Sequence, residues 1–111
     1  MYRIGIQPDQ IALRNGTVQS FSKRWEQRLR EMGHEPRMLD ANRQEFFEEV
    51  AACDGFMWTF TQTVYSRHFG RRVVAAVEHG MGMPVFPSWK TVWTFDDKIG
   101  QQYLLRAAGI P

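Results

Sequence analysis

Hydrophobic residues along this chain switch repeatedly between the spacing of strands and the spacing of helices. Short apolar runs predict strands at residues 2–7 and 55–60, with weaker ones at 36–41 and 83–87. The run at 55–60 is the most apolar, as expected for a central strand buried on both faces, while Pro84 indicates that the last strand lies at an edge. This alternation predicts a three-layer, Rossmann-like α/β domain with about four mostly parallel strands and helices on both faces.

The first predicted helix follows a segment of about ten residues that has no clear pattern. Its apolar residues, Phe21, Trp25 and Leu29, lie four positions apart, as on one face of a helix. Ser20 or Ser22 is the expected N-cap, because a serine hydroxyl can accept a hydrogen bond from a free amide of the first turn.

Two further helices are expected between the later strands. Residues 43–53 form one of them, opened by a capping box in which Asn42 is followed three residues later by Glu45. The other is indicated by apolar residues four apart and ends at Gly80. Those apolar residues are Tyr65, Phe69, Val73 and Val77.

Composition narrows the class of protein. The chain has 111 residues, the size of one domain, and its 43% hydrophobic residues are enough for a core. The net charge is only +2 and the basic residues are scattered, so we expect no nucleic-acid partner. A single cysteine, Cys53, excludes an internal disulfide, and no apolar run approaches the roughly eighteen residues of a membrane span. These features predict a cytoplasmic protein that does not bind membranes.

Several common ligand motifs are missing. The loop after the first strand lacks the glycine-rich turn of dinucleotide-binding domains, and the pair Gly80 and Gly82 is not followed by the residues of a P-loop. The histidines, His34, His68 and His79, fall on separate elements without ligand partners at suitable spacing, so no metal site is expected.

Polar and aromatic residues follow the predicted strands at their carboxyl ends, where open parallel sheets bind ligands. The predicted crevice residues are Gln7, Asp9, Trp58, Thr59, Thr61, Gln62, Ser88, Trp89 and Lys90. They suit a polar small molecule, but they contain no pair of nucleophile and base, and no catalytic residue is predicted. The alternative is that Trp58 and Trp89 belong to the core and that the polar residues cap helices.

The last quarter of the chain carries a distinct motif. Phe95-Asp96-Asp97-Lys98-Ile99-Gly100 begins a predicted helix that starts near Thr94, and the chain closes with Ala108-Gly109-Ile110-Pro111. This resembles the junction of ATP-grasp ligases such as D-alanine–D-alanine ligase, glutathione synthetase and RimK-type glutamate ligases. In those proteins an Asp-Lys pair opens a helix that ends in Gly-Ile-Pro, just before the nucleotide-binding domain. The resemblance implies that residues 1–111 are a single pre-ATP-grasp domain and that an ATP-grasp domain follows Pro111.

The resemblance also implies an activity. The parent protein would be an ATP-dependent carboxylate–amine ligase that forms an acylphosphate with ATP and Mg²⁺. Lys98 would contact the ATP phosphates, whereas Asp96 and Asp97 would be helix-start residues and not metal ligands. The 111-residue chain alone is expected to be inactive, to form one wall of the site for the carboxylate and amine substrates, and to contribute to a homodimer contact.

A different class of function stays open beside the ligase. The chain could be a stand-alone Rossmann-like module that binds a protein or a small ligand. In that case Trp58, Trp89 and Trp93 would form an exposed aromatic patch.

Overall fold

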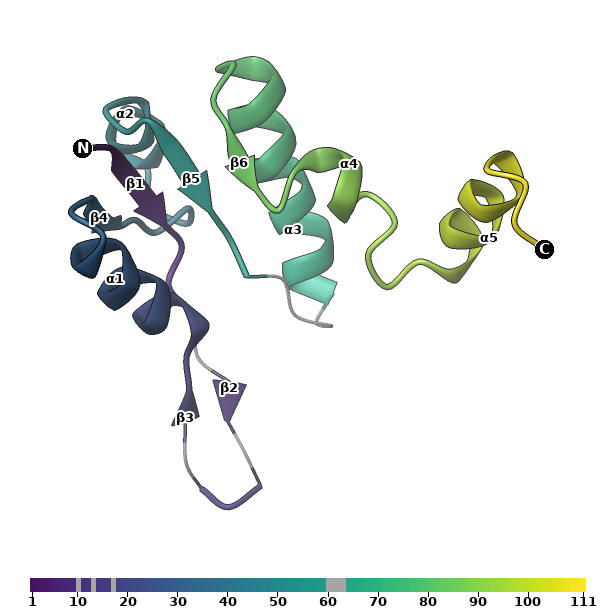
Figure 1. The fold of residues 1–111 in the computed structure, drawn as a ribbon, viewed down its shortest axis with the longest axis horizontal. Coiled ribbons are helices and arrows are strands. Elements are labelled where there is room, and N and C mark those ends of the chain that lie inside the picture. Colours follow the sequence, from purple (N-terminus) through teal and green to yellow (C-terminus); the bar gives the residue numbers. More distant parts are fainter. Residues whose placement is uncertain (10, 13, 17, 60–63) are drawn as a thin grey trace.

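The computed structural model describes residues 1–9, 11–12, 14–16, 18–59 and 64–111. Its centre is a four-stranded sheet in which every neighbouring pair is parallel (Figure 1). The strand order is β4 (Glu35–Met38), β1 (Arg3–Ile6), β5 (Gly55–Met57) and β6 (Val85–Phe86). The α/β class is confirmed, and so is the edge position of the strand that follows Pro84.

Helices connect successive strands of this sheet, as is usual for parallel strands. The connection from β1 to β4 contains α1, that from β4 to β5 contains α2, and that from β5 to β6 contains α3 and a π-helical turn, η1. Two more helices, α4 and α5, follow the last strand. Their bounds are α1 (Phe21–Glu31), α2 (Phe46–Ala51), α3 (Val64–Ala75), η1 (Ala76–Gly80), α4 (Trp89–Val92) and α5 (Lys98–Ala107).

The alternation of side chains along β1 separates the two faces of the sheet. Ile4 shares a cavity with Leu29 of α1, so α1 covers the face to which Ile4 and the fully buried Ile6 belong. A Cβ atom on Gly5 would lie 2.9 Å from Leu39 and 3.3 Å from Phe56, on the opposite face. The sheet therefore has helices on both sides and forms three layers.

The main hydrophobic core lies on the face of Gly5, between the sheet and helices α2 and α3. Phe46 of α2 packs edge-on against Phe56 of β5, with ring centroids 5.4 Å apart. Trp58 is only 4% exposed and belongs to this core, which was the alternative to a place in the ligand crevice. The buried members are Leu39, Phe46, Val50, Cys53, Phe56, Trp58, Val73, Val74, Val77, Val85 and Val92.

The predicted start of the second helix is wrong. Helix α2 begins at Phe46, and Asn42 does not cap it. The carboxylate of Asp40 instead accepts hydrogen bonds from the backbone amide of Asn42 at 2.9 Å and from its side chain at 2.8 Å. This local turn holds the backbone out of a helix until Phe46, because Asx side chains compete with helical hydrogen bonding.

The segment between β1 and α1 contains a small hairpin that the pattern of hydrophobic residues did not predict. Strands β2 (Ile11–Ala12) and β3 (Val18–Gln19) pair antiparallel below the sheet (Figure 1). A turn at Asn15-Gly16 lies between the two strands, with Gly16 at φ +82°, where a side chain would be strained. Ser20 is the N-cap of α1, as one of the two candidates predicted.

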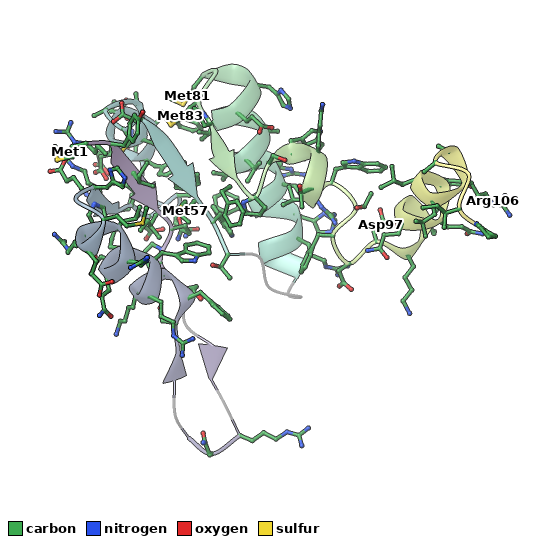
Figure 2. The ribbon with its side chains drawn as sticks, in the orientation of Figure 1. Met1, Met57, Met81, Met83, Asp97 and Arg106 are labelled. Atoms are coloured by element: carbon green, nitrogen blue, oxygen red, sulfur yellow. The ribbon has the colours of Figure 1, made fainter. Side chains whose placement is uncertain are left out.

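The C-terminal helix begins later than predicted and projects from the sheet (Figure 1). Residues 89–92 form the unpredicted helix α4, and α5 starts at Lys98, not near Thr94. Asp97 is the N-cap of α5 and accepts a hydrogen bond from Gly100 at 2.9 Å, while Asp96 precedes it at φ +52° (Figure 2). Neither acid therefore lies inside the first turn.

Candidate functional site

The structure does not gather the predicted crevice residues in one place. Gln7 and Asp9 line a cavity at the carboxyl ends of β1 and β4, which we call the polar cavity. Trp58 and Thr59 line a different one at the ends of β5 and β6, which we call the aromatic cavity. The first turn of α1 contributes to both, because Phe21 lines the aromatic cavity whereas Ser20 and Ser22 line the polar one.

The other predicted crevice residues lie elsewhere. Ser88, Trp89 and Lys90 are at the start of α4, where the amide of Trp89 donates to Glu78 and the Ser88 hydroxyl meets that of Thr91. Ser88 stands at the N-cap position of α4, but its side chain makes no capping hydrogen bond there. Thr61 and Gln62 lie outside the described residues.

Lys98 is separated from both cavities, because α5 projects away from the sheet (Figure 1). Its exposed side chain lines a surface cavity of about 480 Å³ that also contains Arg106. Two cationic side chains from one helix therefore border the same depression, together with the amides of Gln101 and Gln102.

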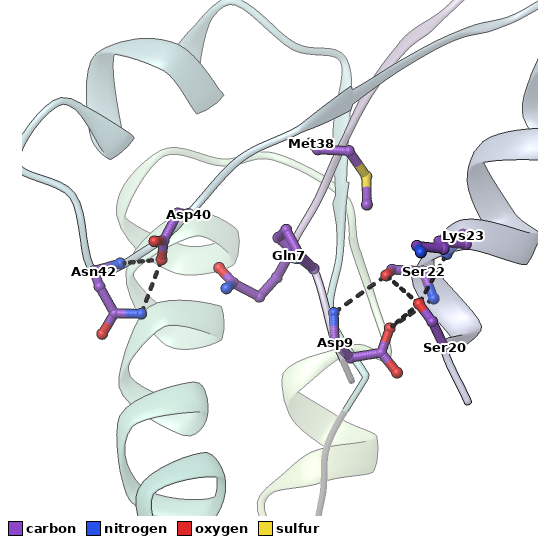
Figure 3. A pocket seen from close by; sticks show the side chains of 9 residues that line it. Gln7, Asp9, Ser20, Ser22, Lys23, Met38, Asp40 and Asn42 are labelled. Carbon is purple, nitrogen blue, oxygen red and sulfur yellow. Dashed lines mark hydrogen bonds between the residues drawn. The ribbon is translucent and has the colours of Figure 1, made fainter. Parts of the chain in front are cut away.

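The polar cavity has a volume of about 320 Å³ and lies beside the N-terminus of α1 (Figure 3). In doubly wound domains this position between the first strand and the first helix receives the phosphate groups of nucleotides. Its lining carries two carboxylates, one ammonium group and several hydroxyl and amide groups. The lining residues are Gln7, Pro8, Asp9, Ser20, Ser22, Lys23, Met38, Asp40 and Asn42.

The carboxylate of Asp9 accepts hydrogen bonds from backbone amides at the start of α1. One carboxylate oxygen accepts from the amide of Ser22 at 2.7 Å and from the hydroxyl of Ser20 at 3.3 Å, and the other accepts from the amide of Phe21 at 3.2 Å. In return the amide of Asp9 donates to the Ser22 hydroxyl at 3.1 Å (Figure 3). The carboxylate of Asp9 thus accepts from helix-start amides of the kind that bind phosphate in nucleotide-binding domains.

These contacts keep Asp9 ionised. Partial burial of the carboxyl group favours its protonated form, but the hydrogen bonds from Ser22, Phe21 and Ser20 together outweigh that effect, so the pKa of Asp9 lies below its usual value. An ionised carboxylate at a helix N-terminus also gains from the helix dipole. The negative charge repels an anionic ligand from this end of α1.

Asp40 supplies the second carboxylate of the polar cavity. Hydrogen bonds from the backbone and then the side chain of Asn42 lower the pKa of Asp40, against a smaller opposing effect of burial. The side chain of Gln7 accepts from the amide of Ala41 at 2.8 Å and so ties the end of β1 to the segment after β4. Lys23, on the first turn of α1, is the cation of the lining.

The polar cavity suits ligands that carry ammonium or hydroxyl groups. Two ionised carboxylates attract a cation, and the mixed hydroxyl and amide groups can donate to and accept from hydroxyls. Sequence reasoning missed Asp40, Asn42 and Lys23 as site residues. The position of Asp40 at the end of a predicted strand parallel to the first was the signal that could have found it.

The aromatic cavity has a volume of about 290 Å³ and a different chemistry. Trp25 of α1 meets Phe86 of β6 edge to face, with centroids 6.1 Å apart. The lining residues are Phe21, Trp25, Trp58, Thr59, Phe86, Pro87, Thr91, Val92 and Phe95. None of these described residues carries a charge, so this cavity favours an uncharged group.

Magnesium prefers oxygen ligands such as carboxylates. Among them, no group of three or more His, Cys, Asp and Glu side chains is placed to hold a metal. Asp9 and Asp40, the carboxylates of the polar cavity, already accept hydrogen bonds from backbone amides.

The helices that the structure describes are too short or too polar for a bilayer crossing.

Comparison of the chain with protein-family models, with curated proteins and with solved structures finds no match.

Proposed function

We propose that this chain is the substrate-side domain of an ATP-dependent carboxylate–amine ligase and that its polar cavity receives the amine substrate. One observation carries the proposal: Asp9 fills the phosphate position at the start of α1 with a fixed negative charge. That arrangement disfavours a nucleotide here and favours a cationic ligand. Together with Asp40, it makes an amine the best-matched substrate for this wall of the active site.

The C-terminal motif supplies the second support. Lys98 is the first residue of α5, directly after the capping residue Asp97, and its side chain is exposed. Together with Arg106 it presents positive charge around one surface cavity, as the phosphates of ATP would require. ATP would supply the phosphoryl group that activates the carboxylate substrate. The residues of this chain would hold the amine and neutralise phosphate charge.

An NMR titration of the uniformly ¹⁵N-labelled chain tests the assignment of the polar cavity. We expect ethanolamine to shift the amide signals of Asp9, Phe21 and Ser22, and inorganic phosphate to leave them in place. Asp40→Asn should weaken the ethanolamine response, while the exposed Glu48→Gln on α2 should not. Shifts caused by phosphate in place of the amine would contradict the proposal.

The ligase activity itself is tested in the native full-length protein. If the reading frame continues past Pro111 into an ATP-grasp domain, ATP hydrolysis should depend on an added amine and fall in Lys98→Ala. A reading frame that stops at Pro111 would leave no residues to form the nucleotide-binding lobes and would overturn the ligase proposal.

The second candidate is a stand-alone module that binds a small ligand. The three-tryptophan patch is not formed as predicted, because Trp58 is buried in the core and only 4% exposed, although Trp93 is 36% exposed. The aromatic cavity is the observation that favours this candidate.

A further inference from the structure

The aromatic cavity lies at the carboxyl ends of β5 and β6, beside the first turns of α1. Helix α1 covers the region near β1 and β4, but Phe86 on the edge strand β6 remains 59% exposed. The opposite face is filled by α2 and α3, and no second helix accompanies α1 among the described residues. Aromatic rings from α1, β6 and the segment after α4 therefore border a depression that stays accessible to ligands.

A polar atom without a partner lies in this apolar lining. Thr59 follows β5 by two residues, and its buried hydroxyl oxygen has no hydrogen-bond partner within the part of the chain that the structure describes. A buried hydroxyl without a partner costs free energy, since it has lost its hydrogen bonds to water. A ligand group that exchanges a hydrogen bond with Thr59 would remove that cost.

The described lining also limits the charge of the ligand. None of the nine residues that border the aromatic cavity is ionisable, and burying an unpaired charge among aromatic rings is strongly unfavourable. The ring of Trp25 stands at 76° to that of Phe86, so that faces and edges both border the space. Such surroundings favour a planar ring, which can stack on one neighbour and meet another edge to face.

The chain's own C-terminal helix does not fill this space. Arg71 of α3 donates hydrogen bonds to the carbonyls of Val92 and Phe95, and Arg67 forms an ion pair with Asp96 at 3.5 Å. These contacts hold the segment before α5 against α3, and α5 then projects away from the sheet (Figure 1).

From this combination we infer that the aromatic cavity is a binding site for a small, uncharged aromatic compound that carries one hydrogen-bonding group directed at Thr59. The volume of about 290 Å³ limits the buried part to one or two rings. The inference does not rest on the ligase activity, because it involves neither the polar cavity nor Lys98.

Binding is measured by NMR titration of the chain, following the indole N–H signals of Trp25 and Trp58. The probes are p-cresol, its isostere p-xylene without a hydroxyl group, and the anion p-toluate. We expect saturable binding of p-cresol, weaker binding of p-xylene and none of p-toluate. Thr59→Val should weaken the binding of p-cresol about two- to tenfold, the effect of one hydrogen bond, and leave the binding of p-xylene unchanged.

A pair of exposed apolar residues provides matched variants that should both fold. Phe86→Ala removes part of the lining and should weaken the binding of p-cresol and of p-xylene alike. Met32 is 56% exposed and lies outside the cavity, so Met32→Ala should leave the binding of both probes unchanged. The inference is overturned if no neutral probe saturates or if Phe86→Ala binds as the wild type does. Sedimentation that shows self-association abolished by Phe86→Ala would also overturn it, since the surface would then be a contact between copies of the chain.

Discussion

Single residues define the chemistry of the polar cavity, and Asp9 has the largest effect. Its carboxylate accepts hydrogen bonds from the amides of Phe21 and Ser22, and amides at this position of a nucleotide-binding doubly wound domain bind a phosphate. A side chain that supplies the negative charge from within the chain stabilises the start of α1 at all times. The negative charge of Asp9 also favours cationic or neutral ligands in the polar cavity.

Asp9→Asn should destabilise the fold by about 1 kcal/mol at neutral pH. The asparagine oxygen can still accept from one amide, but its NH₂ group would face the other. Because the pKa of Asp9 is lowered in the folded state, its contribution is fully present above the unfolded value of about 4 and is lost as the pH falls through the folded value. Urea unfolding of both proteins at pH 7 and in acid measures this difference.

The control is Glu48→Gln, an exposed carboxylate in the first turn of α2 whose replacement should change the stability much less than Asp9→Asn does at pH 7. A stability difference between wild type and Asp9→Asn that persists unchanged in strong acid would show that the charge of Asp9 is not what stabilises α1.

At the scale of elements, only one face of helix α2 packs against the sheet, and neighbouring residues on it differ sharply in burial. Phe46 and Phe47 are neighbours in sequence, yet Phe46 is 1% exposed and Phe47 is 49% exposed. Phe46 contacts Phe56 of the central strand, while the ring of Phe47 packs only partly, against Phe46. The turn made by Asp40 and Asn42 sets where α2 begins and hence which phenylalanine faces the sheet.

Phe46→Ala should cost about 3 to 5 kcal/mol of unfolding free energy, the usual cost of deleting a buried aromatic ring. Phe47→Ala should cost less than about 1 kcal/mol, because most of its surface is already in water. Chemical denaturation followed by circular dichroism compares the two variants directly. Equal losses would mean that the helix is rotated relative to the arrangement described.

At the scale of the whole molecule, the chain divides into a packed α/β layer structure and a projecting C-terminal helix (Figure 1). Every residue of α5 except Gly100 is exposed, including Ile99 at 67% and Tyr103 at 64%. The side chain of Trp93 approaches Gly100 closely, and Asp97 caps the first turn. Few tertiary contacts therefore support the ten residues of this helix.

Amide hydrogen exchange should separate these two parts. We expect α5 to exchange through local opening of nearly zero free energy, because isolated helices of about ten residues are marginal in water, whereas β1 and β5 should exchange only through global unfolding. Removal of residues 98–111 should change the unfolding free energy of the rest by less than about 0.5 kcal/mol. Protection of α5 equal to that of β5 would contradict this division.

The sequence was sufficient for features that depend on local spacing. The strands at 55–57 and 85–86, an N-cap at Ser20 or Ser22 and the edge position after Pro84 were predicted from the period of apolar residues and from backbone preferences. These are properties of a few neighbouring residues, and the tertiary structure leaves them unchanged.

Only the tertiary structure decided which side chains share a cavity. The sequence placed Gln7, Asp9, Trp58 and Thr59 at one edge of the sheet, but α1 inserts its first turn between the polar and aromatic groups and divides them. The hydrogen bonds from Phe21 and Ser22 to Asp9, and the distance of Lys98 from both cavities, depend on how helices pack on the sheet. Such contacts join residues far apart in the chain, and no local pattern encodes them.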